Sequence, residues 1–250
     1  MKKVSSYLIV MMVLLVLSVS SPGAAGVNWG IYDEFLKTHV TTGEIRGTTL
    51  SLVNYSAIKK DPRWSEILKQ LAEVNLADLQ TKQDKLAFYI NAYNIFAIKM
   101  VVDHWPLESI RDVGSWIFPV WKKDVGILAG RQVTLHKIEH EILRKLDEPR
   151  IHFAIVCASV SCPDLLSEPY LAGKLDEQLE QQVVSFLNNE GKGLRVEGRE
   201  IQVSKIFDWF DEDFESTGGI EQFVRQYKPG LPTGLQVEAD IDYDWGVNSR

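Results

Sequence analysis

The residues best suited to chemistry are concentrated in positions 150–163, where the sequence reads R-I-H-F-A-I-V-C-A-S-V-S-C-P. This stretch contains one histidine, His152, both cysteines of the protein, Cys157 and Cys162, and the serines Ser159 and Ser161. A cysteine attacks carbonyl carbons when it is deprotonated and a base lies beside it. Cys157 is therefore the candidate nucleophile of a hydrolase or transferase that acts on a peptide or amide.

The partner of such a thiol is sought first in the same stretch. Ile151–Cys157 combines β-branched and aromatic residues without polar alternation, which predicts a strand buried on both faces. In a strand, His152 and Cys157 would lie on opposite faces and about 16 Å apart, so they could not form a catalytic pair. His152 then fits a core histidine that pairs with Glu139 or with a buried amide.

A base could instead come from the preceding predicted helix, residues 134–146. Its sequence His136-Lys137-Ile138-Glu139-His140 offers two imidazoles for Cys157 and a glutamate to orient one of them. The same residues fit H-x-x-E-H, in which two histidines bind Zn²⁺ and the glutamate acts as a base. In an α-helix, however, Glu139 would face the core edge while His140 leans outward, and no third ligand is identifiable. A zinc hydrolase is thus the second alternative, and we assign no metal site.

The first 25 residues have the pattern of a secretory signal peptide. Two lysines precede an apolar run over positions 8–17, and the small residues 23–25 follow it. The apolar run is shorter than the roughly 20 residues of a spanning helix. We expect cleavage after Ala25 and a periplasmic or secreted mature protein with no stable membrane span, with a retained N-terminal anchor as the alternative.

Export favours a disulfide between the two cysteines, because the compartments to which proteins are exported are oxidising. Across a short turn, the Cα atoms of Cys157 and Cys162 can come within the roughly 4.4–6.8 Å that a disulfide requires. The bond would stabilise the fold by only about 2 kcal/mol, since the closed loop is small. We therefore expect a Cys157–Cys162 disulfide that fixes the shape of the loop, with reversible redox use as a lesser alternative.

The composition is that of a globular protein with a substantial core. The chain has 250 residues, of which 45% are hydrophobic and 24% charged, and its net charge is -7. Nucleic-acid binding needs clustered lysines and arginines, and the sequence has no long basic run. We therefore expect no nucleic-acid partner.

Hydrophobic periodicity and turn residues predict the elements that position these groups. Helices are expected over Val27–Val40, from Asp61 to Val74, from Thr81 to about His104, from Thr134 to Leu146, over Leu171–Leu187 and from about Gly219 to Tyr227. Hairpins are expected around Ala129-Gly130 and around Gly198, and a last strand over Leu235–Ile241. Gly43 and Gly47 predict a loop after the first helix.

Two segments carry polar residues whose role is open. The helix from Thr81 is apolar nearly all round, which predicts a buried central helix, so its amides Asn91 and Asn94 must be hydrogen-bonded. We expect a structural polar network there, with a place in a site as the alternative. For the acidic-aromatic run Asp208–Glu215 we expect solvated carboxylates beside a packed aromatic face.

Several segments together resemble a known family. They are K-L-A-F-Y-I-N-A-Y-N (85–94), I-E-H-E-I-L-R (138–144), the stretch 150–163, I-F-D-W-F-D-E-D-F (206–214) and Y-D-W-G-V-N (243–248). In this order and spacing they resemble the domain-of-unknown-function family 547, over roughly Tyr55 to Asn248. The resemblance implies an exported bacterial protein. The family also occurs fused to other segments in plant proteins, and the resemblance implies no established activity.

These observations lead to one expected organisation. Residues 1–25 are a cleaved signal peptide, 26–54 an N-terminal helix and loop, and 55–250 a single α+β domain with a buried central helix, a small mostly antiparallel sheet and surrounding helices. We favour a non-catalytic envelope binding module without a cofactor, whose partner is an unknown small molecule or envelope protein. The cysteine-dependent hydrolase or transferase, with Cys157, His140, Glu139 and His152 as its site, is the alternative.

Overall fold

A computed structural model describes residues 26–114 and 120–250. The predicted signal peptide, residues 1–25, lies outside the described residues, as do Trp116 and Phe118 of the aromatic segment before the first predicted hairpin.

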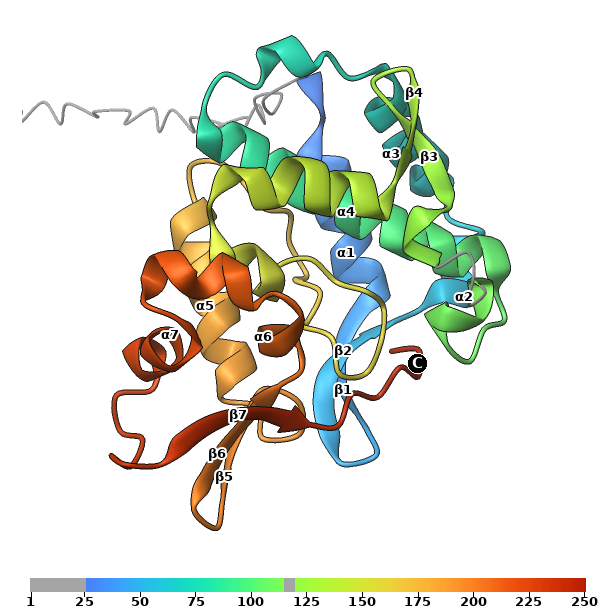
Figure 1. The fold of residues 1–250 in the computed structure, drawn as a ribbon. Coiled ribbons are helices and arrows are strands. Elements are labelled where there is room, and N and C mark those ends of the chain that lie inside the picture. The colour runs from blue at the N-terminus through green and yellow to red at the C-terminus, as the bar shows by residue number, and fades with distance from the viewer. Residues whose placement is uncertain (1–25, 115–119) are drawn as a thin grey trace, which may run out of the picture.

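Helices and small sheets alternate along the chain, which confirms the α+β class (Figure 1). The α-helices are α1 (Trp29–His39), α2 (Tyr55–Ile58), α3 (Pro62–Glu73), α4 (Lys82–His104), α5 (Leu175–Leu187), α6 (Ile206–Trp209) and α7 (Ile220–Tyr227). The strands are β1 (Val40–Ile45), β2 (Thr48–Val53), β3 (Asp124–Leu128), β4 (Arg131–Thr134), β5 (Leu194–Glu197), β6 (Glu200–Ser204) and β7 (Gln236–Ile241).

Helix α4 is the buried central helix that the sequence predicts. It begins with a capping box in which the Thr81 side chain accepts from the Asp84 N–H and the Asp84 side chain accepts from the Thr81 N–H. It ends before Pro106, which cannot continue a helix. Among the described helices, α4 alone is long and apolar enough to cross a membrane. Of its most apolar 18-residue stretch, 89% is buried inside the protein. A core helix of a globular protein has the same properties.

The interior is divided into two hydrophobic clusters. The first surrounds α4 and takes residues from α1 to α3 and from β3 and β4. The second lies among α5, α6, α7 and the three-stranded sheet β5–β6–β7. Phe153 belongs to the second cluster and Ile155 to the first, so the stretch before Cys157 passes from one cluster to the other.

The sheets are small and each has its own register. Strands β1 and β2 pair antiparallel, as do β3 with β4 and β5 with β6, whereas β6 and β7 pair parallel. The hairpins predicted around Ala129-Gly130 and Gly198 are confirmed. The loop predicted at Gly43 and Gly47 is wrong, because this segment forms the β1–β2 hairpin. Its turn residues Arg46 and Gly47 have φ of 51° and 80°, as a type I′ hairpin turn requires.

The strand predicted over Ile151–Cys157 is also wrong. A 3₁₀-helix occupies Pro149–Phe153, with the proline in its first turn, and the chain continues without regular structure to Cys157. The backbone there needs no neighbouring strand, because a side chain of α4 replaces one. Asn94 Nδ2 donates to the Ala154 carbonyl at 3.0 Å, and Asn94 Oδ1 accepts from the Val156 N–H at 2.9 Å. The side-chain alternation of a strand therefore does not separate His152 from Cys157.

Candidate functional site

A cavity of about 230 Å³ lies between the two hydrophobic clusters. Its lining includes the four residues that the sequence predicts for catalysis, Cys157, His140, Glu139 and His152, together with His136 and Cys162. Aromatic side chains form much of the remaining wall: Tyr93, Trp121, Trp209, Phe210, Tyr243 and Trp245. The structure thus brings the stretch 150–163 and the His136–His140 segment to one site.

Cys157 and Cys162 are free thiols, so the predicted disulfide is absent from the structure. The Cys162 sulfur accepts from the Cys157 N–H at 2.7 Å, which turns it toward the backbone of its neighbour. Cys157 Sγ lies 3.0 Å from Ser159 Oγ and 3.2 Å from the Tyr243 hydroxyl. Burial disfavours the thiolate, but hydrogen bonds from Cys162, Ser159 and Tyr243 outweigh it and lower the pKa of Cys157 to about 7. Cys157 can therefore be a thiolate near neutral pH.

The turn after Cys157 has strained backbone geometry. Ala158 has φ of 62°, in the left-handed region that residues with a Cβ seldom occupy. The C-terminal segment holds this turn, because the Asn248 N–H donates to the Ala158 carbonyl at 3.1 Å and the Val160 N–H to the Gly246 carbonyl at 2.8 Å. The same pairing brings Tyr243, 86 positions from Cys157 in the sequence, to the thiol.

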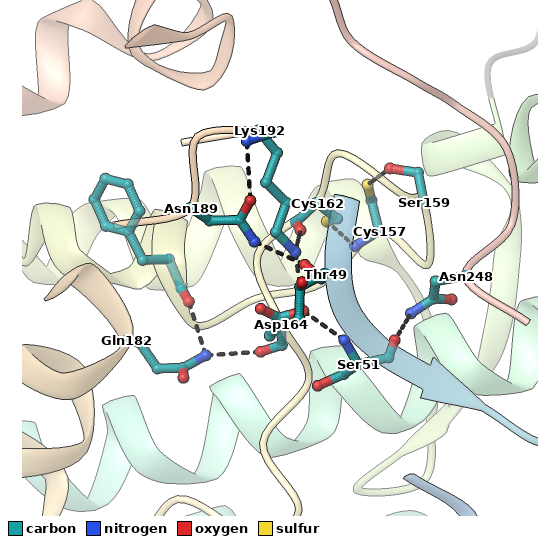
Figure 2. A network of polar contacts seen from close by, with 12 residues as sticks. Thr49, Ser51, Cys157, Ser159, Cys162, Asp164, Gln182, Asn189, Lys192 and Asn248 are labelled. Atoms are coloured by element: carbon teal, nitrogen blue, oxygen red, sulfur yellow. Dashed lines mark hydrogen bonds and ion pairs between the residues drawn. The ribbon is translucent and has the colours of Figure 1, made fainter. Parts of the chain in front are cut away.

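A buried lysine supports the loop that contains Cys162 (Figure 2). Lys192 is 1% exposed, and its Nζ donates to the Cys162 carbonyl at 2.8 Å and to Asp164 Oδ1 at 2.9 Å. Asp164 Oδ1 also accepts from the Ser51 N–H of β2 at 2.6 Å, and Asn248 Nδ2 donates to the Ser51 carbonyl at 3.1 Å. The loop is thereby fixed to β2 and to the C-terminal segment, which holds Cys157 in place.

Glu139 is the buried acid of the cavity. Its carboxylate accepts from the Tyr93 hydroxyl at 3.2 Å, and the residue is 8% exposed. Burial raises the pKa of Glu139 to about 7, the Tyr93 hydrogen bond opposes this, and the negative charge of Cys157 adds to the rise. Glu139 is therefore able to give or take a proton near neutral pH, which an ordinary carboxyl group is not.

Residues Lys137–Leu143 form a π-helix, not the α-helix that the sequence predicts. The wider turn changes the angular relation between its side chains, so the α-helical placement of Glu139 and His140 does not apply. Glu139 is buried, and the rings of His136 and His140 lie 4.3 Å apart between centroids. Within residues 26–114 and 120–250, no three histidine, cysteine, aspartate or glutamate side chains are grouped as metal ligands.

His140 is held by an arginine one turn further along. Arg144 donates to His140 Nδ1 at 2.9 Å, which places the proton of the neutral imidazole on Nε2. Burial is the first cause that lowers the pKa of His140 to about 4, and the charges of His136 and Arg144 lower it further. At neutral pH His140 is therefore a neutral hydrogen-bond donor and a weak base.

His152 pairs with Asp213 and not with Glu139 or an amide, which corrects the prediction. Its Nε2 lies 2.7 Å from Asp213 Oδ2, and Arg144 binds both oxygens of the same carboxylate, at 2.6 and 2.9 Å. Burial lowers the pKa of His152 despite the aspartate. Asp213 lies in the run expected to be solvated, yet its hydrogen bonds to His152 and Arg144 outweigh burial and lower its pKa below the usual range. Phe210 of the same run stacks on the His152 ring at 4.1 Å.

The remaining predicted polar residues support the site without lining it. Asn91 exchanges two hydrogen bonds with the backbone of Tyr170, at 2.8 and 2.9 Å, much as Asn94 does with residues 154–156. Ser161 Oγ accepts from the Asp244 N–H at 2.8 Å. These contacts join α4 and the C-terminal segment to the loops on either side of Cys157.

Sequence reasoning missed several residues that complete the site: Tyr93, Arg144, Asp213, Trp209, Tyr243 and Trp245. Each lies in a segment that resembles the family named above, which was the available signal. None of them stands close to Cys157 in the sequence, so spacing could not reveal that they gather around the same site.

Comparison with known proteins places the centre of the chain in a family. Residues 76–187 match the model of the family described as "Protein of unknown function, DUF547". No curated protein and no solved structure matches the chain. The matched part contains Glu139, His140, His152 and both cysteines, whereas the resemblance of residues 206–214 and 243–248 to the family lies outside it and stays a prediction. Residues 76–187 of this chain therefore belong to the DUF547 family.

Proposed function

We propose that the protein is a thiol-dependent acyl-transfer enzyme, a hydrolase or transferase that acts on a peptide or amide through Cys157. The observation that carries the proposal is a thiol of lowered pKa, held by Ser159 and Tyr243, at a cavity that also contains an acid of raised pKa, Glu139. Perturbed groups that converge on one cavity are typical of catalytic sites. The exported location of the protein stays a prediction.

Acylation begins with the Cys157 thiolate and ends with a thioester. The thiolate attacks the carbonyl carbon, a C–S bond forms, and the carbonyl electrons move to the oxygen. His140, neutral and protonated on Nε2, is suited to donate a hydrogen bond to that oxyanion. When the C–N bond breaks, the leaving amine takes the proton of the Glu139 carboxylic acid.

Deacylation reverses the role of Glu139. Its carboxylate takes a proton from water, in a hydrolase, or from an acceptor amine, in a transferase, as either attacks the thioester. The C–S bond then breaks, which restores the Cys157 thiolate and the protonated Glu139. Because Cys157 must be ionised and Glu139 protonated, and both pKa values are about 7, we expect kcat/KM to peak near pH 7.

Alkylation of the purified protein tests the nucleophile directly. We expect iodoacetamide to label Cys157 faster than an ordinary thiol between pH 6 and 8, with its rate rising through a pKa of about 7. Cys162 is the internal control, because burial raises the pKa of its thiol and it is 4% exposed. Peptide mapping by mass spectrometry assigns each adduct.

An acyl-enzyme trap tests the chemistry. Incubation with p-nitrophenyl acetate should add one acetyl group at Cys157, and the adduct should be absent from Cys157→Ser and present in Cys162→Ser. A Cys157–Cys162 disulfide in protein isolated without reductant, or a Cys157 that alkylates no faster than glutathione below pH 8, would overturn the proposal. Either result would favour the non-catalytic binding module.

A further inference from the structure

We infer that the cavity beside Cys157 accepts the acyl side of the substrate and that this acyl group carries one uncharged aromatic ring. The inference rests on the proposed function, because it takes Cys157 as the atom that attacks the carbonyl. It names a substrate class, esters or amides of arylacetic-type acids. The size, the walls and the polar groups of the cavity each support it.

The size of the cavity fits one ring. A cavity of about 150 Å³ lined by apolar side chains is enough to bind benzene. The cavity beside Cys157 has about 230 Å³. That volume leaves room for a six-membered ring and the few atoms that join it to the carbonyl, but not for two linked rings.

The walls are aromatic, and one of them is partly open to solvent. Trp209 is 44% exposed, so part of its surface is accessible to a ligand. It stacks on Trp245 at 5.5 Å with 24° between the planes, and Tyr243 lies 4.8 Å from it. These three rings contact one another along the cavity wall, and the Tyr243 hydroxyl lies 3.2 Å from the Cys157 sulfur. A ligand ring that packs on this surface gains both buried area and aromatic contact.

Three polar side chains of the cavity, Glu139, His140 and His152, are already paired, which disfavours a sugar ring, although Lys122 and His136 also line the cavity. Glu139 is bonded to Tyr93, and His140 and His152 have Arg144 and Asp213 as partners. A pyranose would bring several hydroxyls into a wall with few groups left to bond them, and unpaired buried polar groups are costly. An arylacyl group brings only its carbonyl, which His140 and the thiolate meet in the reaction.

A series of p-nitrophenyl esters tests the inference on the purified protein. We expect kcat/KM for the phenylacetyl ester to exceed that for the acetyl ester by about 100-fold, because the added ring becomes buried. A biphenylacetyl ester exceeds the room available and should fall back at least tenfold from phenylacetyl. Equal kcat/KM for acetyl and phenylacetyl esters would overturn the inference.

Two exposed residues form a matched pair of variants. Trp209→Ala should reduce the phenylacetyl-to-acetyl selectivity about tenfold, because the outer wall of the cavity is lost. Val196→Ala, on β5 and outside the cavity lining, is 47% exposed and should leave the selectivity as it is. Selectivity that survives Trp209→Ala unchanged would contradict the assigned wall.

Binding without chemistry separates this inference from the proposed function. In Cys157→Ala, phenylacetamide should quench tryptophan fluorescence saturably, whereas acetamide and N-acetylglucosamine at the same concentrations should not. Saturable quenching by phenylacetamide with no acyl-enzyme in the wild type would retain the aromatic site and refute the proposed acyl transfer. Saturation by N-acetylglucosamine alone would refute the aromatic class and indicate a sugar ligand instead.

Discussion

Two histidine–aspartate–arginine triads occur among the described residues, and they differ in what lies beside them. They are the α1 triad (His39, Asp61, Arg63) and the cavity triad (His152, Asp213, Arg144). The Nε2–Oδ2 distance is 2.8 Å in the α1 triad and 2.7 Å in the cavity triad. In both, hydrogen bonds from the histidine and the arginine hold the pKa of the aspartate below its usual range.

The two triads have different surroundings. The α1 triad is local, since its arginine follows its aspartate by two residues and that aspartate caps α3. Its histidine has a buried Nδ1 with no partner among the described residues. The cavity triad joins segments 61 and 69 positions apart and borders the space that contains Cys157. A histidine–aspartate bond is therefore not a catalytic signature by itself, and the thiol and the cavity are what distinguish the two.

The largest difference between the triads should appear when the acid beside the cavity triad is neutralised. Glu139→Gln keeps the shape of the side chain but cannot transfer a proton, so we expect kcat to fall about 10²- to 10⁴-fold. His39→Gln, in the α1 triad, should leave kcat within about twofold of the wild type. Steady-state kinetics on an amide substrate measures both. Activity retained in Glu139→Gln would remove the carboxyl group from the proposed proton transfers.

Replacing the aspartate of each triad with asparagine compares what the two triads contribute to the stability of the fold. The arginine side chains of the two triads are partly exposed, 29% for Arg63 and 21% for Arg144, so the loss is that of hydrogen bonds to a charged group and not of a fully buried ion pair. Asp61→Asn and Asp213→Asn should therefore each destabilise the protein at pH 7 by roughly 1.5–3 kcal/mol. The lowered aspartate pKa values mean that the wild-type advantage is fully present above the unfolded pKa of 3.8 and is lost gradually as the pH falls from there through the folded pKa, so it should be smaller at pH 3 than at pH 7. Urea unfolding at pH 7 and pH 3 measures this.

The same two variants, Asp61→Asn and Asp213→Asn, should differ in activity. Asp213→Asn should also slow alkylation of Cys157 or acyl transfer, because the wall made by His152 and Phe210 loses its anchor. Asp61→Asn, measured at a temperature where it is folded, should not. A loss of activity of equal size in both variants would mean that the cavity triad acts only through stability, as the α1 triad does.

The pH dependence of stability tests the raised pKa of Glu139. Its pKa rises from 4.5 in the unfolded chain to about 7 in the fold, so the folded state retains the proton and loses stability as the pH rises from 4.5 to 7. The loss corresponds to roughly 3 kcal/mol. Glu139→Gln has no carboxyl group to ionise. Its free energy of unfolding, measured in urea relative to that of the wild type, should therefore rise by the same amount between pH 4.5 and pH 8. A constant difference across this range would place the carboxyl group in contact with water.

The smallest expected effect concerns the imidazole beside the cavity triad. Arg144→Met removes the donor to His140 Nδ1 and a nearby positive charge, so the pKa of His140 should rise from its value of about 4. Arg63→Met, the matched change in the α1 triad, should leave it unaltered. NMR titration of the imidazole signals reports both. A His140 pKa that stays near 4 in Arg144→Met would assign the shift to burial and the neighbouring histidines and not to Arg144.

Local patterns in the sequence were sufficient for most of the secondary structure. The Thr81 capping box, the apolar run of α4 and the turn at Ala129-Gly130 act within a few residues, so their outcome depends little on the rest of the chain. The same reasoning failed at Ile151–Cys157. A buried apolar segment only needs its backbone groups satisfied, and the side chain of Asn94 meets that need as well as a strand does.

For the site, the sequence by itself determined which groups are present: a thiol between serines, and a glutamate and histidines on the helix before it. Their protonation states and the partners of the thiol were decided by the tertiary structure alone. Tyr243 meets Cys157 from 86 positions away and Asp213 meets His152 from 61. The pKa values of Cys157 and Glu139 follow from burial and from these distant contacts. The physical reason is that burial and electric field depend on every residue packed around a group, and the order of residues along the chain does not specify that packing locally.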